Sequence, residues 1–313
     1  SYRTSTLGRC GFLGGYRWGH CAVAEGACRL APAGLGMMLW QGAVAFELWT
    51  PCKNKENLMS IRLVTVRDVV LGEGMPKVCV PVTARTHPEL VAQAALASAA
   101  GPDLVEWRVD FFDEVTDPAA VLSALDALRR GLGEIPLVFT FRSAREGGRR
   151  ELPEAEYVAL IERASASGFV DVVDVELFTS EAAVRSVVAS AHAHAVAAIV
   201  SSHDFAATPP AAELVARLRR AQELGADLPK LAVTPTSPRD VLALLEATWT
   251  MASTYAEVPI ITMSMGGDGV ITRLAGEVFG SALTFAAVGA TSAPGQVDLE
   301  TVARVLALIH ANR

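Results

Sequence analysis

Cysteine is scarce outside the first part of this sequence, and its distribution bears on the compartment and on metal binding. Of the five cysteines, only Cys79 lies beyond residue 52. A secreted disulfide framework spreads its pairs through the fold, so we expect a reducing compartment, the cytoplasm. The other four do not fit the ligand spacing of a zinc site, so no metal is expected. These four are Cys10, Cys21, Cys28 and Cys52.

The chain also lacks a basic surplus and an uninterrupted apolar run. With 27 basic and 34 acidic residues, its formal net charge of −7 opposes a phosphate backbone, and we expect no nucleic-acid partner. Residues 30–49 are mostly apolar, but Gln41, Glu47 and several glycines interrupt them. A membrane-spanning helix needs about 20 apolar residues, so this stretch is a poor candidate and no membrane partner is expected.

The first 58 residues show no clear helical or strand period. Their apolar stretch starts too far into the chain and ends in the wrong residues for a secretory signal peptide. We therefore expect residues 1–58 to be an extension outside the fold, for example from an early start codon, with Met59 as a candidate start. The catalytic domain is then expected at residues 59–313.

From residue 60 onward, apolar runs rich in β-branched residues alternate with alanine-rich amphipathic stretches. Residues 62–66 and 69–71 predict a small hairpin. Further strands are predicted near 78–83, 104–109, 137–142, 171–175, 196–201, 230–234, 259–264 and 283–288. Helices are predicted near 88–100, 118–130, 154–167, 181–193, 210–223, 238–252, 270–279 and 298–311.

Strict alternation of strands and helices leaves two α/β architectures, a closed barrel and an open doubly wound sheet. The open sheet typically has a glycine-rich loop after its first strand. Here that strand ends without glycine, at Val82-Thr83-Ala84-Arg85-Thr86. The sequence therefore predicts a (β/α)8 TIM barrel with an N-terminal β-hairpin.

Polar side chains follow the predicted strand ends, where such a barrel carries its chemistry. Glu106, Arg108 and Asp110 share one face by the two-residue strand period. A structural ion pair, such as Glu106 with Arg108, is the alternative reading. The other polar ends are Arg142 with Ser143 and Glu146, Asp174 with Glu176, residues 201–204, Lys230, residues 262–266 and residues 291–296.

Lys230 lies among apolar neighbours in a strand that faces the barrel interior. Burying an ammonium group is costly unless it is paired or neutralised. Desolvation and neighbouring cations favour the free amine, which attacks carbonyl carbons to form a Schiff base. The alternative is a lysine whose head reaches the rim and binds an anion.

His203 ends the strand beside that of Lys230, and an imidazole moves protons in both directions near neutrality. Its alternative role is structural. Arg108, Arg142 and Arg273 come from separate elements, and convergent guanidinium groups suit a substrate that carries a carboxylate. The glycines of residues 266–269 precede a helix and are a weak candidate for a phosphate cradle.

Together these residues resemble type I 3-dehydroquinate dehydratase, and the likeness runs from about residue 60 to residue 312. This family belongs to the shikimate pathway, which leads to chorismate and the aromatic amino acids. The matching stretches are Glu106-Trp107-Arg108-Val109-Asp110, Thr140-Phe141-Arg142-Ser143 with Glu146, Asp174-Val175-Glu176-Leu177-Phe178, Ser202-His203-Asp204-Phe205, Lys230, Met263-Ser264-Met265-Gly266 with Arg273-Leu274, Phe279-Gly280-Ser281, and Ser292-Ala293-Pro294-Gly295-Gln296.

The resemblance implies a lyase that converts 3-dehydroquinate into 3-dehydroshikimate. Lys230 would form the Schiff base, His203 would move the proton, and Glu146 would position His203. The substrate-binding residues implied are Arg273, Gln296 and Ser292 for the carboxylate, Glu106, Arg108 and Arg142 for ring hydroxyls or the lysine, and Met265 and Phe285 as apolar walls.

The resemblance further implies no cofactor, no metal, a homodimer and a cytoplasmic enzyme. Because no second domain follows residue 312, we expect no shikimate dehydrogenase joined to the barrel. Two other functions stay open from the residues alone. One is another Schiff-base barrel enzyme of the class I aldolase kind, and the other is a catalytically silent barrel that binds a carboxylate.

Overall fold

The computed structural model describes residues 23–24, 27–28, 61–289 and 295–313. The chain divides into two units, Ser1–Asn57 and Leu58–Arg313. In the first unit, β1 (Val23–Ala24) pairs antiparallel with β2 (Ala27–Cys28). The expected extension at 1–58 and its apolar stretch lie otherwise outside the described residues. No helix among the described residues is long and apolar enough to cross a membrane.

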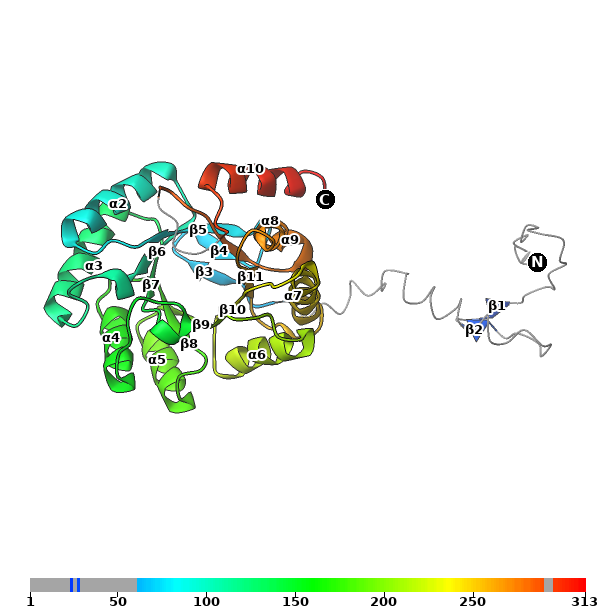
Figure 1. Ribbon diagram of the computed structural model, residues 1–313, viewed down its shortest axis with the longest axis horizontal. Coiled ribbons are helices and arrows are strands. Elements are labelled where there is room, and N and C mark those ends of the chain that lie inside the picture. The colour runs from blue at the N-terminus through cyan, green and yellow to red at the C-terminus, as the bar shows by residue number, and fades with distance from the viewer. Residues whose placement is uncertain (1–22, 25–26, 29–60, 290–294) are drawn as a thin grey trace, which may run out of the picture. The chain divides into compact units, whose positions relative to one another are not determined.

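Eight parallel strands form the centre of the second unit (Figure 1). Their order in the sheet is β11-β10-β9-β8-β7-β6-β5-β12, and a bridge between Ile260 and Ser281 joins the two edges. The prediction of a TIM barrel is confirmed. The strands are β5 (Lys77–Val82), β6 (Leu104–Arg108), β7 (Leu137–Thr140), β8 (Val172–Glu176), β9 (Ala197–Asp204), β10 (Leu228–Val233), β11 (Ile261–Ser264) and β12 (Leu283–Phe285).

Helices follow the strands and surround the sheet (Figure 1). The predicted helix at 270–279 is instead two short helices, which meet at Ala275. Gly276 opens the second one, and a Cβ there would lie only 3.0 Å from Pro76, so close packing fixes the break. The helices are α2 (His87–Ala100), α3 (Pro118–Leu132), α4 (Glu154–Ala166), α5 (Glu181–Ala193), α6 (Ala211–Glu223), α7 (Pro238–Thr250), α8 (Val270–Leu274), α9 (Gly276–Phe279) and α10 (Leu299–His310).

Proline and a capping side chain set the start of two helices. Asp117 accepts the backbone N–H of Ala119 at 2.9 Å, and Pro118 takes the first position of α3. Ser237 and Asp240 form a capping box at α7. At α6 the prolines precede the helix instead, and Pro210 is its N-cap residue. These caps satisfy backbone donors that the helices leave unpaired.

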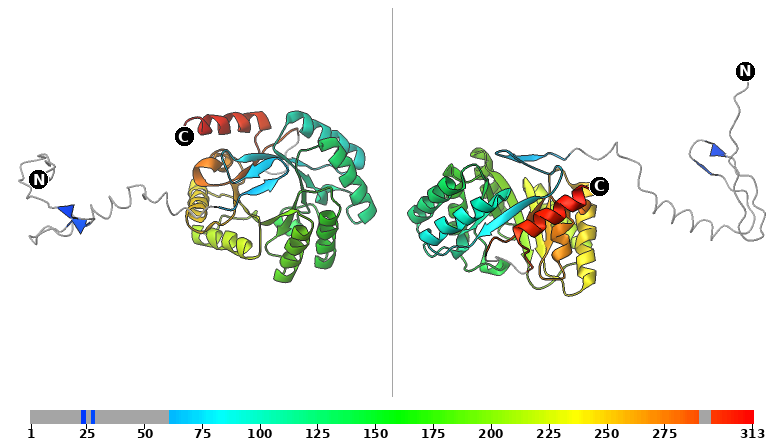
Figure 2. Two further views of the ribbon diagram at one scale, coloured as in Figure 1. Left: turned by 180° about the vertical axis from the view of Figure 1, so that it is seen from behind. Right: turned by 90° about the horizontal axis from the view of Figure 1, so that it is seen from above.

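The predicted hairpin is formed by β3 (Val64–Val66) and β4 (Val69–Leu71), and it covers the N-terminal end of the barrel (Figure 2). Val64, Val66 and Leu71 are buried against apolar residues near the beginnings of the barrel strands. Arg67 turns the hairpin with a φ of 51°, in the left-handed region. Because this end is filled by side chains, the cavity of the barrel opens at the other end.

Candidate active site

A cavity of about 200 Å³ lies at the C-terminal ends of the barrel strands. Such a volume suits one small molecule. The predicted site residues of the described chain all line it, whereas Ser292 lies outside the described residues. Those lining it are Glu106, Arg108, Arg142, Glu146, His203, Lys230, Met265, Arg273, Phe285 and Gln296. The structure therefore brings together residues from six different strands or the loops after them.

Lys230 projects from the middle of β10 into this cavity and is only 5% exposed. Its Nζ lies 3.2 Å from a carboxylate oxygen of Asp174 and 3.6 Å from one of Glu106. The ring centroid of Phe285 lies 4.6 Å from the same nitrogen. The side chain is thus held within the cavity, not at its rim. The two carboxylates hold the nitrogen in place, and the free-base form of an amine is the nucleophile that attacks a carbonyl.

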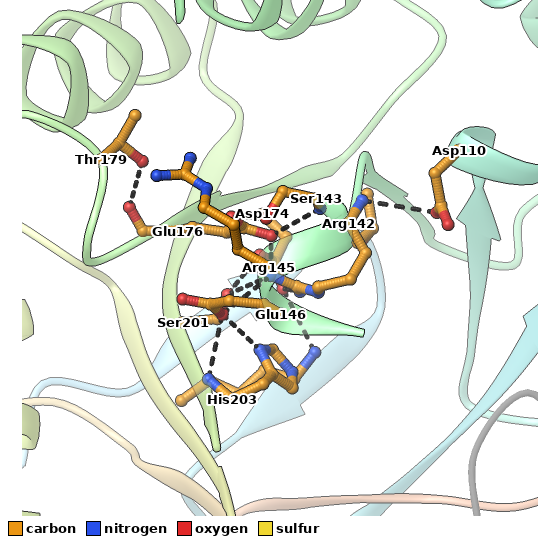
Figure 3. A network of polar contacts seen from close by, with 12 residues as sticks. Asp110, Arg142, Ser143, Arg145, Glu146, Asp174, Glu176, Thr179, Ser201 and His203 are labelled. Atoms are coloured by element: carbon orange, nitrogen blue, oxygen red, sulfur yellow. Dashed lines mark hydrogen bonds and ion pairs between the residues drawn. The ribbon is translucent and has the colours of Figure 1, made fainter. Parts of the chain in front are cut away.

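Arg142 lies at the centre of a buried network of carboxylates (Figure 3). Its guanidinium contacts Asp174 at 2.9 Å and Glu176 at 3.0 Å, and Ser201 accepts a hydrogen bond from it. Burial alone would raise the pKa of Asp174, but the charges of Arg142 and Lys230 outweigh it and hold that pKa below its ordinary value. Asp174 is therefore an ionised partner for Lys230.

His203 and Glu146 form a pair on the wall of the cavity (Figure 3). The Oε2 of Glu146 lies 2.9 Å from Nδ1 of His203 and also accepts the backbone N–H of His203 at 2.9 Å. Because Oε2 acts as an acceptor towards the backbone, we assign the Nδ1 proton to the histidine, which donates it to the same oxygen. The lone pair of the imidazole is then on Nε2, the nitrogen that does not face Glu146.

Burial shifts the pKa values of Glu146 and His203 in opposite directions. It raises the pKa of Glu146 to about 8, although the nearby charge of Arg142 opposes this. Burial also lowers the pKa of His203 well below 6.5, and the charges of Arg142 and Lys230 lower it further. His203 is therefore neutral at neutral pH and ready to accept a proton, and Glu146 is protonated.

Arg108 and Glu106 line the β6 side of the cavity. The alternative reading was an ion pair between Glu106 and Arg108, and the two side chains have other partners instead. Arg108 pairs with Asp110 at 2.8 Å, and Glu106 accepts a hydrogen bond from Thr140 at 2.9 Å. Both side chains keep their place in the cavity wall, so each is available to a ligand.

Arg273 and Gln296 line another part of the cavity, together with two methionines. Arg273 is 1% exposed, and burial lowers its pKa to about 10, which still leaves it charged at neutral pH. A buried guanidinium is suited to bind a carboxylate. Met263, Met265 and Phe285 supply apolar surface to the cavity.

Sequence reasoning gave no site role to several residues of the cavity. The sequence marks Asp174 as a polar strand end within a matching stretch and gives it no role, although its carboxylate pairs with Lys230. Met263 was noted only in a matching stretch, but the two-residue period that places Met265 in the cavity also places Met263 there. Phe205 and Gly147 meet at the mouth, where a Cβ on Gly147 would lie 2.3 Å from the Phe205 ring. No pattern in the sequence predicts this contact between Gly147 and Phe205.

Other motifs of the sequence lie elsewhere or have a packing role. His192 bonds Asp227 at 2.8 Å in a different cavity, and His194 is exposed. In the glycine run 266–269, a Cβ on Gly269 would lie 2.2 Å from the carbonyl oxygen of Ser264, so this turn needs glycine for packing. Within the described residues, no cluster of three or more histidine, cysteine, aspartate or glutamate residues is arranged to hold a metal ion.

Comparison with known proteins gives two family matches and close relatives. The family described as Type I 3-dehydroquinase matches residues 78–313, and the Shikimate 5'-dehydrogenase C-terminal domain matches residues 34–59. The 3-dehydroquinate dehydratase of Bacillus licheniformis is 51% identical over 251 residues, which cover 80% of this chain and 99% of that protein. That of Syntrophotalea carbinolica is 53% identical over 247 residues, covering 79% and 98%. The crystal structure of the type I enzyme from Clostridium difficile, with covalent modified comenic acid, has a TM-score of 0.79 at 48% identity, covering 81% and 99%.

Proposed function

The chain belongs to the type I 3-dehydroquinase family, and we propose that Lys230 and His203 carry the reaction of that family in it. The enzyme dehydrates 3-dehydroquinate to 3-dehydroshikimate through a lysine Schiff base, a step of the shikimate pathway. The observation that supports the assignment of residues is the cavity itself. The side chains of Lys230 and His203 both line this small cavity.

The first half of the reaction is the formation of the Schiff base at Lys230. The Nζ amine adds to the ring ketone, and the resulting carbinolamine loses water to give a protonated imine. Asp174, at 3.2 Å from Nζ, stabilises this cation as it stabilises the ammonium. The imine draws electrons from the adjacent ring carbon, so the proton on that carbon becomes acidic.

The second half is an elimination, and His203 moves the proton in both steps. Nε2 removes the proton beside the imine, and the electron pair moves toward the imine nitrogen to form an enamine. The enamine expels the hydroxyl one carbon further on, which takes the proton from His203 and leaves as water. Hydrolysis of the new imine releases the product and restores Lys230. Glu146 orients the imidazole through Nδ1 throughout.

The remaining cavity residues orient the substrate ring. We assign its carboxylate to Arg273, Gln296 and Ser292, because a buried guanidinium is suited to bind a carboxylate. We assign its hydroxyl groups to the β6 and β7 side of the cavity, where charged side chains gather. The residues of that side are Glu106, Arg108 and Arg142, and the apolar walls are Met265 and Phe285.

Trapping of the imine tests this assignment. Incubation with 3-dehydroquinate followed by borohydride is expected to leave the product mass on the peptide that contains Lys230. The Lys230→Met variant is the control, and we expect it to bind substrate without turnover or adduct. An adduct at another lysine contradicts the role of Lys230. An adduct that forms only with a sugar phosphate favours the aldolase alternative. A wild type that binds 3-dehydroquinate without turnover, with the same affinity as Lys230→Met, favours the silent barrel.

The match of residues 34–59 to a shikimate 5'-dehydrogenase domain favours a second function in the same polypeptide. This segment is shorter than the roughly 40 residues below which a chain rarely folds alone. We infer that this segment is only a part of a dehydrogenase domain. The two activities fit in series, because 3-dehydroshikimate is shikimate with a ketone at carbon 3. A reduced nicotinamide dinucleotide would give a hydride to the ketone carbon, and solvent would give the proton. This inference replaces the expectation that no dehydrogenase is joined to the barrel.

An antibody against the barrel tests the second function in a lysate of the source organism. We expect the captured protein to reduce 3-dehydroshikimate with a reduced nicotinamide dinucleotide. A captured protein that dehydrates 3-dehydroquinate but shows no reductase activity contradicts the inference.

We also propose a cytoplasmic homodimer. The compartment is supported by the low cysteine content. Leu242 and Trp249, both more than half exposed, lie two turns apart on one face of α7, and Val278 is exposed on α9, which packs against α7. Exposed apolar clusters of this kind are typical of protein contacts. Light scattering is expected to give twice the chain mass, and Trp249→Glu is expected to give the monomer mass. A monomeric wild type would contradict the proposal.

A further inference from the structure

We propose that Asp110 is a positioning residue for the reaction. Its carboxylate fixes both the side chain of Arg108 at the cavity and the loop that carries Glu146. The proposal rests on the function assigned above. Asp110 is fully buried, in the short helical turn Val109–Phe111 that follows β6. It does not line the cavity itself, so any effect on the reaction must pass through its neighbours.

The carboxylate of Asp110 accepts hydrogen bonds on both of its oxygens. The side chain of Arg108 donates to both, from Nε to Oδ1 at 2.8 Å and from Nη2 to Oδ2 at 2.9 Å. The backbone N–H of Arg142 donates to Oδ1 at 3.3 Å, a contact drawn in Figure 3. The backbone N–H of Arg149 donates to Oδ2 at 3.1 Å. Asp110 thus joins one guanidinium to two points of the chain that follows β7.

Those two points enclose the loop that holds Glu146. Within this loop the N–H of Gly148 donates to the carbonyl of Ser143 at 2.8 Å. A Cβ on Gly148 would lie 1.8 Å from the carbonyl oxygen of Arg142, so the loop is folded tightly on itself. With its ends held by Asp110, the loop places Glu146 within 2.9 Å of His203. The geometry connects the substrate-binding side of the cavity to its acid–base pair.

A side chain with acceptors on both of its terminal atoms is needed at this position because four donors converge on it. Charge-assisted hydrogen bonds are stronger than neutral ones, and bidentate pairing fixes the plane of a guanidinium. Asparagine has the same shape but presents an NH₂ group to donors on one side. The Asp110→Asn variant therefore loosens Arg108 and one end of the loop at the same time.

Asp171 offers a matched control at the other end of the barrel. It accepts hydrogen bonds from Arg67 at 2.7 Å, from Arg129 at 2.8 Å and from the backbone N–H of Leu137 at 2.8 Å. Its surroundings are similar to those of Asp110, because guanidinium and backbone N–H donors converge on one carboxylate, but it lines a different cavity. Asp171→Asn is expected to lower stability and to leave kcat, KM and their pH profiles unchanged.

The test compares the kinetics of Asp110→Asn and Asp171→Asn with those of the wild type. For Asp110→Asn we expect kcat/KM to fall about 10–100-fold, the range seen when an outer partner of functional residues is removed. KM is expected to rise because Arg108 is loosened. The pH profile of kcat is expected to shift on its alkaline side, because Glu146 is displaced. If Asp110→Asn changes only stability, as Asp171→Asn does, the proposal is wrong.

A double-mutant cycle with Arg108→Gln separates the two connections. If Asp110 holds both Arg108 and the loop, we expect Asp110→Asn to lower kcat and to shift the pH profile of kcat even in the Arg108→Gln background. If its effect vanishes in that background, Asp110 acts through Arg108 alone and the connection to Glu146 is refuted.

Two further measurements distinguish a failure of the Asp110 proposal from a failure to fold and from a failure of the proposed function. Hydrogen exchange in the wild type is expected to show a protected Arg149 amide although the Arg149 side chain is exposed, and rapid exchange there contradicts the proposal even if Asp110→Asn does not fold. Borohydride trapping at Lys230 is done first on the wild type. Failure of that step refutes the proposed function, whereas a normal adduct with unaltered Asp110→Asn kinetics refutes only the role of Asp110.

Discussion

At the residue scale, the site depends on how many protons the pair of Glu146 and His203 holds. The neutral imidazole needed to accept a proton from substrate is favoured by burial and by the cations around it. The same burial keeps Glu146 protonated up to a pH of about 8. Above that pH the carboxylate ionises next to Nδ1 and stabilises the imidazolium that His203 becomes when it takes the substrate proton.

The Glu146→Gln variant tests this coupling. In the wild type we expect kcat to rise as the pH increases through about 8, because the ionised Glu146 supports the imidazolium. Glutamine keeps an acceptor for Nδ1–H but cannot ionise, so its kcat is expected to be flat across this range. We also expect it to be about 10–100-fold lower, since a positioned partner has been weakened. The measurement is kcat by absorbance of the product enone from pH 6 to pH 10. Parallel profiles in the two proteins would show that Glu146 does not titrate in the reaction.

The residues that act here are only partly visible in a sequence. A lysine in an apolar strand and a histidine at the next strand end stand out because burial makes them costly. Their partners do not stand out. Lys230 meets Asp174 because β8, β9 and β10 are adjacent in a particular register, in which Lys230 lies opposite Ser201 and Ser201 opposite Glu176. No local pattern specifies that register, so the ion pair required the structure.

At the scale of elements, strands and helices were predictable because burial on both faces makes each strand a continuous apolar run. The departures occur where tertiary packing decides. The strand β10 begins at Leu228, two residues before the prediction, and includes Pro229. The division of α8 from α9 follows from the close approach of Gly276 to Pro76. The hairpin of β3 and β4 was predicted from sequence, but its place over the barrel end was not.

The hairpin is expected to contribute to stability and not to catalysis. Leu71 is fully buried at the end of the barrel opposite the cavity, so Leu71→Ala leaves a void. We expect a loss of about 2–5 kcal/mol in the free energy of unfolding, measured with denaturant, and an unchanged kcat/KM. Leu63→Ala is the control on the same hairpin, because Leu63 is 42% exposed and its loss should matter little. Equal losses in the two variants would argue that the hairpin does not close the core.

At the scale of the whole molecule, the barrel contains every described residue of the cavity, and the hairpin packs against its core. We therefore expect a chain that starts at Met59 to retain the kcat/KM and the unfolding midpoint of the full chain. A chain that starts at Met75 is the matched control, since it lacks Val64, Val66 and Leu71, and its unfolding midpoint is expected to fall. Dehydration rates and denaturant unfolding of the three proteins are the measurements. If the Met59 chain loses activity while the full chain keeps it, residues 1–58 are part of the catalytic unit, and the division of the chain at residue 58 is wrong.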